Sequence, residues 1–245
     1  MNKSLIHTNN FNPISLNEMD GVKLMNRSDT KFTFSSEKLP SLFENLIPFY
    51  NVLEIDGKRI HSYRSLYFDT DDRKFYNDHH NRRVNRHKIR FREYEDSGLV
   101  FLEVKCKNNK GKTIKKRLKV DKIPTKLSND HKTYVEKIMG YSLSVLPKQW
   151  INFRRITLVH KILKERLTID VNLNFSENEA NGDLSKIAIA EVKQERMSRT
   201  SDFIRIAKEM KIYPMRLSKY CFTTMQLDDS IKRNRFKEKQ IFINK

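Results

Sequence analysis

The stretch from His87 to Val120 constrains the fold of this chain more than any other, because it contains three consecutive basic strands. Turn signals at Asp96-Ser97-Gly98 and at Asn108-Asn109-Lys110-Gly111 separate the strands. Successive side chains of a strand point to opposite faces, so the alternation of charged and apolar residues predicts one apolar and one cationic face. The cationic face is predicted to carry Lys88, Arg90, Arg92, Tyr94, Phe101, Glu103, Lys105, Lys107, Thr113, Lys115, Arg117 and Lys119.

Further strands are expected on both sides of this stretch, with helices between them. Strand-like alternation covers residues 25–34, 51–59, 60–69, 150–160, 165–175 and 186–195. Helices are expected at 39–47, 71–80, 129–139 and 200–211, the third of them between a Ser128 cap and a Gly140 stop. Most links between strands are too short for parallel crossovers. We therefore expect about eight strands in an antiparallel sheet or barrel of an α+β domain.

Three regions are predicted along the chain: a flexible N-terminal arm at 1–20, a folded domain at 21–227 and a basic C-terminal tail at 228–245. No apolar run approaches the roughly 20 residues that a membrane span needs, and the N-terminal arm lacks the apolar core of a signal peptide. Cys106 and Cys221 lie far apart and have no metal-ligand spacing. These features predict a cytoplasmic protein.

The charge of the chain predicts a polyanionic partner. The sequence has 49 Lys and Arg against 30 Asp and Glu, a formal net charge of +19. Such an excess suits nucleic acid, an anionic membrane surface or a phosphate-rich molecule. A basic strand face is most often only the solvated side of a sheet, but an ordinary surface mixes both signs. Here the basic pattern recurs on several strands with few carboxylates, which favours a binding face.

Nucleic-acid binding is the first interpretation of this face. Sheets that read single strands stack bases on aromatic residues set among the basic ones. Phe91 points away from the basic residues beside it. Tyr94 and Phe101, however, share the basic face, so the pattern leaves this interpretation open. The sequence has no helix-turn-helix, zinc-finger or RNA-binding signature, no Gly-rich phosphate loop and no Gly-x-Ser-x-Gly elbow.

An enclosed phosphate site is the second interpretation. A closed barrel can turn its cationic faces inward, where a charge pair about 4 Å apart gains roughly 4 kcal/mol at an effective dielectric of about 20, against about 1 kcal/mol in bulk water. Arginine forks would orient a triphosphate or a phosphate chain, and lysines would act as point charges. Such a site explains the excess of cations without requiring base-stacking aromatics.

Six motifs carry a family resemblance: Ser65-Leu66-Tyr67-Phe68-Asp69-Thr70, Lys88-Ile89-Arg90-Phe91-Arg92-x-Tyr94, Phe101-Leu102-Glu103-Val104-Lys105, Arg166-Leu167-Thr168-Ile169-Asp170, Glu191-Val192-Lys193 and Arg216-Leu217-Ser218-Lys219-Tyr220. Together, and in this order, they resemble the vacuolar transporter chaperone (VTC) domain. This is the polyphosphate polymerase branch of the triphosphate tunnel metalloenzymes. The resemblance covers about residues 22–225.

The resemblance implies an eight-stranded antiparallel β-barrel tunnel with helices packed outside. It also implies a metal-dependent phosphotransferase that moves the γ-phosphate of ATP onto a polyphosphate chain. The family's site residues imply catalytic roles for Lys31, Arg90, Arg92, Lys105 and Arg155. They imply phosphate contacts for Arg117, Arg166, Arg216, Ser218 and Lys219, and a Mn²⁺ or Mg²⁺ ligand in Glu191. Alternation alone does not choose between Arg154 and Arg155, whereas the family pattern aromatic-x-Arg picks Arg155 after Phe153.

The chain departs from the hydrolytic tunnel enzymes at their metal motif, Glu-x-Glu-x-Lys, where it has Arg27-Ser28-Asp29-Thr30-Lys31. This departure favours the polymerase over a triphosphatase or polyphosphatase, which is the alternative enzyme. If the chain is not an enzyme, the alternative is a non-catalytic polyphosphate- or RNA-binding module. The expected partners are ATP and inorganic polyphosphate rather than nucleic acid. Any association with a membrane would come through a separate membrane partner protein.

Overall fold

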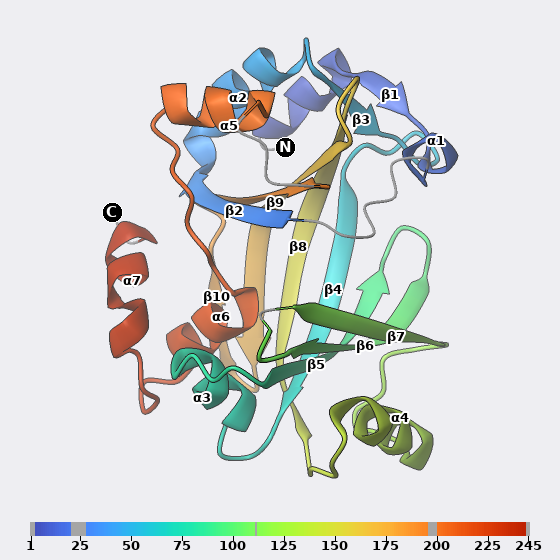
Figure 1. The fold of residues 1–245 in the computed structure, drawn as a ribbon, viewed down its shortest axis with the longest axis vertical. Coiled ribbons are helices and arrows are strands. Elements are labelled where there is room, and N and C mark those ends of the chain that lie inside the picture. The colour runs from blue at the N-terminus through green and yellow to red at the C-terminus, as the bar shows by residue number, and fades with distance from the viewer. Residues whose placement is uncertain (1–2, 21–27, 111, 196–199, 244–245) are drawn as a thin grey trace. The chain divides into compact units, whose positions relative to one another are not determined.

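The computed structural model describes residues 3–20, 28–110, 112–195 and 200–243, so the expected start of a strand at 25–27 lies outside the described residues. The chain forms two compact units, each built from three separate stretches. Unit 1 consists of Met1–His61, Phe153–Leu173 and Leu184–Leu217. Unit 2 consists of Ser62–Asn152, Asn174–Asp183 and Ser218–Lys245. Most helices and strands of both units are labelled in Figure 1.

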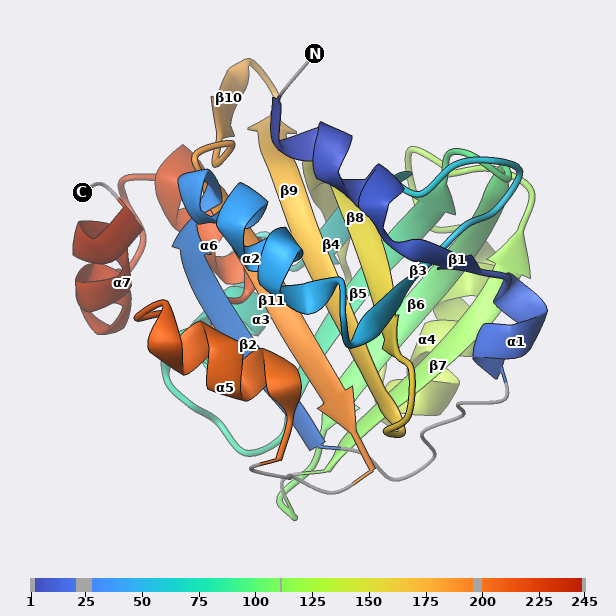
Figure 2. The ribbon, with the colours of Figure 1, turned by 90° about the horizontal axis from the view of Figure 1, so that it is seen from above.

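The sheet of unit 1 has the strand order β2-β11-β9-β8-β3-β1 (Figure 2). Its strands are β1 (Asn12–Ile14), β2 (Ser28–Ser35), β3 (Tyr50–Leu53), β8 (Leu146–His160), β9 (Glu165–Glu177) and β11 (Ile187–Gln194). β11 pairs antiparallel with β2 on one side and with β9 on the other, whereas β1 pairs parallel with β3. β8 and β9 are longer than their neighbours, and each contributes its remaining residues to unit 2.

One face of this sheet packs against the helices α2 (Leu39–Leu46) and α5 (Asp202–Glu209), which lie on the same side of it (Figure 2). The residues of α2 that form its apolar stripe are all buried: Leu39, Leu42, Phe43 and Leu46. Their spacing places them on one face of the helix. Phe32 of β2 meets Phe203 of α5 edge to face, with the ring centroids 5.1 Å apart. The core of unit 1 therefore lies between this sheet face and the two helices.

The N-terminal residues hold secondary structure, although the sequence predicts a flexible arm at 1–20. A 3₁₀ helix (Lys3–Asn10), strand β1 and helix α1 (Leu16–Asp20) follow one another. Phe11 is buried, and its ring meets Phe43 edge to face at 5.9 Å. Ile14 packs against a small cluster that contains Leu53. Phe11, Ile14 and Met19 are spaced too irregularly to give a recognisable pattern, but all three pack on unit 1.

Unit 2 is built around the strand order β4-β5-β6-β7, whose pairs are all antiparallel. These strands are β4 (His61–Asp69), β5 (Arg86–Tyr94), β6 (Leu99–Lys107) and β7 (Thr113–Val120). β8 is the other neighbour of β4, and the short strand β10 (Ala180–Asp183) pairs with the end of β9. The three basic strands predicted from the sequence are β5, β6 and β7.

Helix α4 (Asn129–Met139) covers the apolar face of β5 and β6. The core residues at this contact are Ile89, Phe91, Leu102, Val104, Val135 and Met139. Ser128 caps α4, and Gly140 ends it with a φ of 83°, so the predicted start and end of this helix are confirmed. Because α4 occupies the apolar face, the opposite face of β5 and β6 carries the cations.

Three further helices belong to unit 2: α3 (Lys74–His80), α6 (Lys219–Leu227) and α7 (Lys237–Ile243) (Figure 1). The buried carboxylate of Asp69, at the end of β4, accepts hydrogen bonds from the backbone N–H groups of Phe75 and Tyr76 at 2.8 and 3.0 Å. It therefore fixes the first turn of α3. Phe236, between α6 and α7, is buried against Tyr76, so the basic tail predicted at 228–245 packs on unit 2 at this residue.

The predicted α+β fold, with an antiparallel sheet and helices outside it, is confirmed. Eight strands follow in the hydrogen-bonded order β2-β11-β9-β8-β4-β5-β6-β7, the number that the family resemblance implies. Among the described strands no pairing joins β7 back to β2, so hydrogen bonds do not close the ladder into a barrel. β7 is exposed along most of its length and is rich in Lys and Arg, which is typical of a free sheet edge. Within the described part of the chain, no helix is long and apolar enough to cross a membrane.

Candidate functional site

The residues that the family resemblance singles out are distributed over both units. Those in unit 1 are Lys31, Arg155, Arg166, Glu191 and Arg216. Those in unit 2 are Arg90, Arg92, Lys105, Arg117, Ser218 and Lys219. Each unit has a cationic cluster of its own.

Strand register gathers the cations of unit 2 on one face of its sheet. Lys105 pairs with Lys88 on one side and with Lys115 on the other. In the next row, Glu103 pairs with Arg90. Residues paired across neighbouring strands lie on the same face, so the predicted cationic face is confirmed. We define cluster 2 as Tyr67, Lys88, Arg90, Arg92, Glu103, Lys105 and Lys115.

Arg90 is fixed at the centre of cluster 2. The residue is 8% exposed, and its Nε and Nη2 donate to Oε2 of Glu103 at 2.8 and 2.6 Å. Its Nη1 donates to the hydroxyl of Tyr67 at 2.7 Å. These bonds orient the guanidinium and leave two of its five N–H groups for a ligand, as far as the described residues are concerned.

Glu103 is the carboxylate within cluster 2, and it is only 1% exposed. Its second oxygen accepts a hydrogen bond from Lys115. Burial alone would raise the pKa of Glu103, but the charges of Arg90, Arg92 and Lys115 outweigh burial and hold the pKa below its usual range. The ionised carboxylate offsets one charge among five cations, so cluster 2 keeps a large positive excess.

Lys105 is the cation of cluster 2 whose amino group has no hydrogen bond or ion pair to any described residue. Burial, together with the nearby charges of Arg90 and Lys115, lowers the pKa of Lys105 well below its usual value. Lys105 is half-buried among other cations, and an amine that is partly desolvated without a partner costs stability. An incoming anion would relieve this cost, so Lys105 is a natural contact for a ligand.

Ser218 joins the start of helix α6 to cluster 2. Its Oγ accepts a hydrogen bond from Nζ of Lys88 at 2.7 Å and also caps α6. Lys219 is the first residue of α6. The N-terminus of a helix favours anions, because its first N–H groups are unpaired and the helix dipole is positive there. Arg92 lies on β5 with Lys88, and its Nε donates to Oγ of Ser65 on the neighbouring strand β4 at 3.3 Å.

A second cationic cluster forms around Glu191 in unit 1. Strand register places Lys31 opposite Glu191, and places Asp29 and Arg166 on the two sides of Lys193. Nζ of Lys31 lies 2.6 Å from Oε1 of Glu191, and Nζ of Lys193 lies 3.3 Å from Oε2 of Glu191. We define cluster 1 as Lys31, Arg155, Arg166, Glu191 and Lys193.

The protonation of Glu191 and that of Lys193 depend on each other. Burial alone would raise the pKa of Glu191, but Lys193 and Lys31 hold it well below its usual range. Burial lowers the pKa of Lys193 to about 8; Glu191 opposes this shift, and Arg155 and Lys31 add to it. Lys193 therefore changes its charge close to neutral pH, unlike an exposed lysine.

Arg155 rather than Arg154 belongs to cluster 1. The guanidinium of Arg155 binds both oxygens of the buried Asp170, with Nε to Oδ1 at 2.5 Å and Nη2 to Oδ2 at 2.8 Å. Arg154, one residue earlier, is exposed. A bidentate pair fixes the plane of a guanidinium, so Asp170 decides the direction of Arg155. The structure thus places the residue picked by the family pattern beside Lys193.

The predicted phosphate contacts Arg117 and Arg216 lie outside the two defined clusters, whereas Arg166 belongs to cluster 1. Arg117 is exposed, and its guanidinium lies 4.7 Å from the centre of the Phe101 ring. Arg216 is exposed in the segment before α6. Arg166 is partly buried in the same register row as Lys193. The phosphate contacts of Arg117, Arg166 and Arg216 stay predictions.

Some cluster residues receive no catalytic, phosphate-binding or metal-binding role from the resemblance. Lys88 and Lys115 lie on the cationic face that alternation predicts, and Lys193 follows Glu191 at the same-face spacing of two. Tyr67 differs, because it carries no charge signal. Only its pairing with Arg90 across β4 and β5 brings it into cluster 2.

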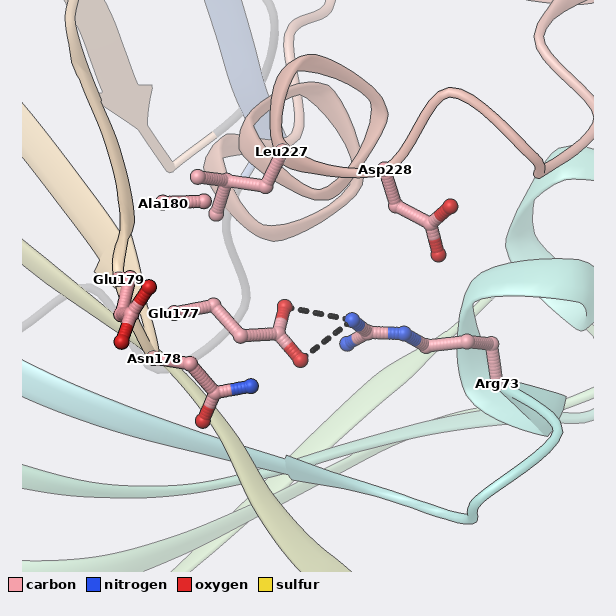
Figure 3. Close-up of a pocket in the computed structure, with 7 residues that line it drawn as sticks. All are labelled: Arg73, Glu177, Asn178, Glu179, Ala180, Leu227 and Asp228. Carbon is pink, nitrogen blue, oxygen red and sulfur yellow. Dashed lines mark hydrogen bonds and ion pairs between the residues drawn. The ribbon is translucent and has the colours of Figure 1, made fainter.

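Unit 2 also contains a cavity of about 450 Å³ that none of the predicted site residues line. Its lining consists of Arg73, Glu177, Asn178, Glu179, Ala180, Leu227 and Asp228. Arg73 and Glu177 point toward each other across it, and Nη2 of Arg73 lies 2.6 Å from Oε1 of Glu177 (Figure 3). One arginine against three carboxylates does not suit a chain of phosphates.

Binding of tripolyphosphate to the clusters is expected to weaken as the pH rises through about 8. Burial is the largest cause that lowers the pKa of Lys115 and that of Lys193, in each case to about 8. Both lysines therefore lose their positive charge there. A terminal phosphate is already doubly ionised above about pH 7, so the charge of the ligand changes little. Calorimetric titrations from about pH 7 to about pH 9.5 measure this loss of affinity.

The contribution of the same two lysines to stability has the opposite sign. Between the folded pKa of about 8 and the usual value of 10.5, the unfolded chain binds more protons than the folded chain. The contribution of Lys115 and Lys193 to the stability of the ligand-free protein therefore rises with pH across this window. Melting curves with and without tripolyphosphate should converge as the pH rises. A ligand-induced shift that stays constant over the window would contradict both trends.

Several solved structures are similar to the chain, among them the following three. A proposed adenylate cyclase from Bacillus halodurans is 15% identical over 80% of this chain and 96% of that chain, with a TM-score of 0.49. A proposed adenylyl cyclase from Hippeastrum, described with a dominant triphosphatase activity, is 17% identical over 80% and 93%, with a TM-score of 0.45. The PH1819 protein from Pyrococcus horikoshii is 12% identical over 81% and 98%, with a TM-score of 0.44. No curated protein sequence matches the chain.

One family model matches most of the chain. It is the model of the VTC domain, and the match runs over residues 26–227. The matched range begins just before β2 and ends at the last residue of α6, so it contains every residue of cluster 1 and cluster 2. The chain therefore belongs to the VTC domain family.

Proposed function

We propose that the chain is a polyphosphate polymerase-type phosphotransferase, which moves the γ-phosphoryl group of ATP onto the end of a polyphosphate chain. The observation that supports this most is cluster 2. Five cations surround one buried carboxylate there, and the amine of Lys105 has no hydrogen bond or ion pair within the described residues. Such a cluster suits a ligand that brings several negative charges at once. Membership of the VTC domain family makes a chain of phosphates the best candidate.

In this proposal, the side chains of Arg90, Arg92 and Lys105 bind the triphosphate of ATP. Arg90 is oriented by Glu103 and can bridge phosphate oxygens with its remaining N–H groups. Lys31 and Arg155 of cluster 1 are proposed to neutralise charge on the phosphoryl group and on the chain. Further phosphate contacts are proposed for Arg117, Arg166, Arg216, Ser218 and Lys219.

This reaction needs little covalent chemistry from the protein. A terminal oxygen of the polyphosphate chain attacks the γ-phosphorus, the bond from that phosphorus to the β,γ-bridging oxygen breaks, and ADP leaves with the electron pair. The transition state spreads negative charge over the phosphoryl oxygens, so positioning and charge neutralisation dominate catalysis. A guanidinium that is already fixed and largely desolvated, as in Arg90, stabilises this charge without reorganising.

We propose that Glu191 holds the divalent cation. Among the described residues no three His, Cys, Asp or Glu side chains gather into a metal site, and the oxygens of Glu191 already lie beside Lys31 and Lys193. A single carboxylate still fits Mg²⁺ or Mn²⁺ when phosphate oxygens and water supply the other ligands. The cation is therefore expected to bind together with ATP and to neutralise phosphate oxygens.

Purified protein incubated with ATP and Mn²⁺ is expected to release ADP and to form polyphosphate. A polyacrylamide gel stained for polyphosphate, together with an ADP assay, measures both products. A reaction with a chelator is the matched control, and neither product is expected in it. Absence of polymer and of released phosphate would contradict the proposal that the chain is an enzyme.

The same assay separates the alternatives. Release of orthophosphate without polymer would identify a triphosphatase, in which water attacks in place of the chain end. Binding of tripolyphosphate without turnover would identify a non-catalytic module. If RNA displaced tripolyphosphate readily, and binding fell steeply with salt, the module would be an RNA binder.

A further inference from the structure

Tyr67 lies within cluster 2 although it is not a charged residue. Strand register places it opposite Arg90, and it is 6% exposed. Its hydroxyl oxygen accepts a hydrogen bond of 2.7 Å from Nη1 of Arg90. Within the described part of the chain, no acceptor takes the proton of this hydroxyl. A buried tyrosine normally uses its O–H group, so Tyr67 has one hydrogen bond left to make.

The surroundings of Tyr67 favour negative charge. Burial alone would raise the pKa of Tyr67, but the charges of Arg90, Arg92 and Lys88 outweigh burial, and the pKa lies below its usual value. The charges of Arg90, Arg92 and Lys88 therefore attract an anion to the position beside the Tyr67 hydroxyl. A phosphate oxygen is an acceptor that carries charge, so it can satisfy the cations and the O–H group together.

The ring of Tyr67 is held in place by a second tyrosine. It stacks on Tyr220 of α6, with the ring centroids 5.1 Å apart and the planes 16° from parallel. The hydroxyl of Tyr220 donates to the carboxylate of Asp69, which also caps α3. The hydroxyl of Tyr67 is therefore fixed before any ligand arrives, which lowers the entropy cost of binding.

We propose that Tyr67 is a phosphate-binding residue, whose hydroxyl donates a hydrogen bond to a non-bridging oxygen of the phosphate group that Arg90 holds. The inference rests on the proposed function, because it requires cluster 2 to bind a chain of phosphates. Arg90 and Tyr67 then act as one unit. One N–H group of Arg90 fixes the phenolic oxygen, and the phenolic O–H group and the remaining N–H groups of Arg90 bind the phosphate.

The test is the variant Tyr67→Phe, which keeps the ring and its stacking on Tyr220 and removes only the hydroxyl. The control is Tyr134→Phe on α4, which packs on the apolar face of the same sheet. Calorimetric titration with tripolyphosphate, without metal, measures the affinity of each protein. Tyr67→Phe is expected to bind about tenfold more weakly or worse, the loss expected for one hydrogen bond to a charged group. Tyr134→Phe is expected to bind like the wild type.

A spectroscopic titration supplies a readout that a purely structural role would not give. In the wild type, one tyrosine is expected to ionise at a lower pH than the others, seen as phenolate absorbance. Tripolyphosphate should move this ionisation to higher pH, because the charge of the ligand disfavours the phenolate. Tyr67→Phe should lack the early ionisation, and Tyr134→Phe should retain it.

The outcomes distinguish the inference from the proposed function. Failure of the wild type to bind tripolyphosphate would overturn the proposed function, and this inference with it. Binding by the wild type with equal affinity in Tyr67→Phe would overturn the inference alone. If circular dichroism shows that Tyr67→Phe is misfolded, the wild-type titration decides the matter. An early tyrosine ionisation that tripolyphosphate does not move would then overturn the inference.

Discussion

Replacement of Glu191 by Gln is expected to abolish metal-dependent phosphoryl transfer while the protein still binds tripolyphosphate. The amide keeps the shape of the carboxylate but lacks its negative charge, so it is a poor ligand for Mg²⁺ or Mn²⁺. Without its carboxylate ligand the cation that would neutralise the transferring phosphoryl group is lost, which should lower kcat by about a hundredfold to a thousandfold. Binding should persist, because the substitution frees Lys31 and Lys193 from their shared carboxylate.

The control for this variant is Glu44→Gln on the exposed side of α2. ADP release under single-turnover conditions and calorimetry with tripolyphosphate measure the two effects separately. The pH dependence offers a third measurement. Glu191 raises the pKa of Lys193, which is about 8 in the wild type, so binding by Glu191→Gln should begin to weaken at a lower pH. Full turnover in Glu191→Gln would show that the metal assignment is wrong.

Replacement of Lys105 by Met is expected to stabilise the ligand-free protein and to remove much of its affinity for tripolyphosphate. The side chain is half-buried beside Arg90 and Lys115, and desolvation together with these charges lowers its pKa well below the usual value. Methionine fills a similar space without a polar group to desolvate. A gain of about 1 kcal/mol in the free energy of unfolding would raise the melting temperature by about 2–4 °C in a protein of this size. Loss of a charged hydrogen-bond donor to phosphate should lower the affinity by about tenfold to a hundredfold.

The control is Lys116→Met on the neighbouring strand, where the side chain is exposed and pairs across the sheet with Val104 of the apolar face. Lys116→Met should change neither the melting temperature of the ligand-free protein nor its affinity for tripolyphosphate appreciably. Melting curves with and without tripolyphosphate measure both effects in one experiment. A lower melting temperature of the ligand-free Lys105→Met would contradict this prediction. An unchanged ligand-induced shift of the melting temperature would show that Lys105 does not bind the anion.

Alternation of residues predicts the two faces of β5, β6 and β7 because side-chain direction in a strand is set locally. Arg90, Glu103 and Lys105 therefore fall on the predicted face, and the register of the sheet brings them together. The ends of α4 are also local, since a serine cap and a glycine in a left-handed conformation fix them. These parts of the fold and of cluster 2 could be predicted from the sequence alone.

Contacts between distant segments decide the features that alternation could not predict. Arg154 and Arg155 are both charged, so the pattern gives no sign of which one turns inward, and the carboxylate of Asp170 on another strand settles it. Tyr67 enters cluster 2 only through its pairing with Arg90. Phe11 gives no helical or strand periodicity, yet it is buried against Phe43 of α2. Each of these outcomes depends on a partner far away in the sequence.

The division of the chain into two units has a consequence for its synthesis. The chain passes between the units five times, so neither unit corresponds to a continuous stretch. In the unit 1 sheet β11 lies between β2 and β9, and a ribosome must make residues up to Ile187–Gln194 before these two strands have this neighbour. Unit 2 is likewise incomplete until α6, at Lys219–Leu227, has been made. The nascent chain therefore carries unpaired strand edges until β11 and α6 have been made, and such edges are prone to aggregation.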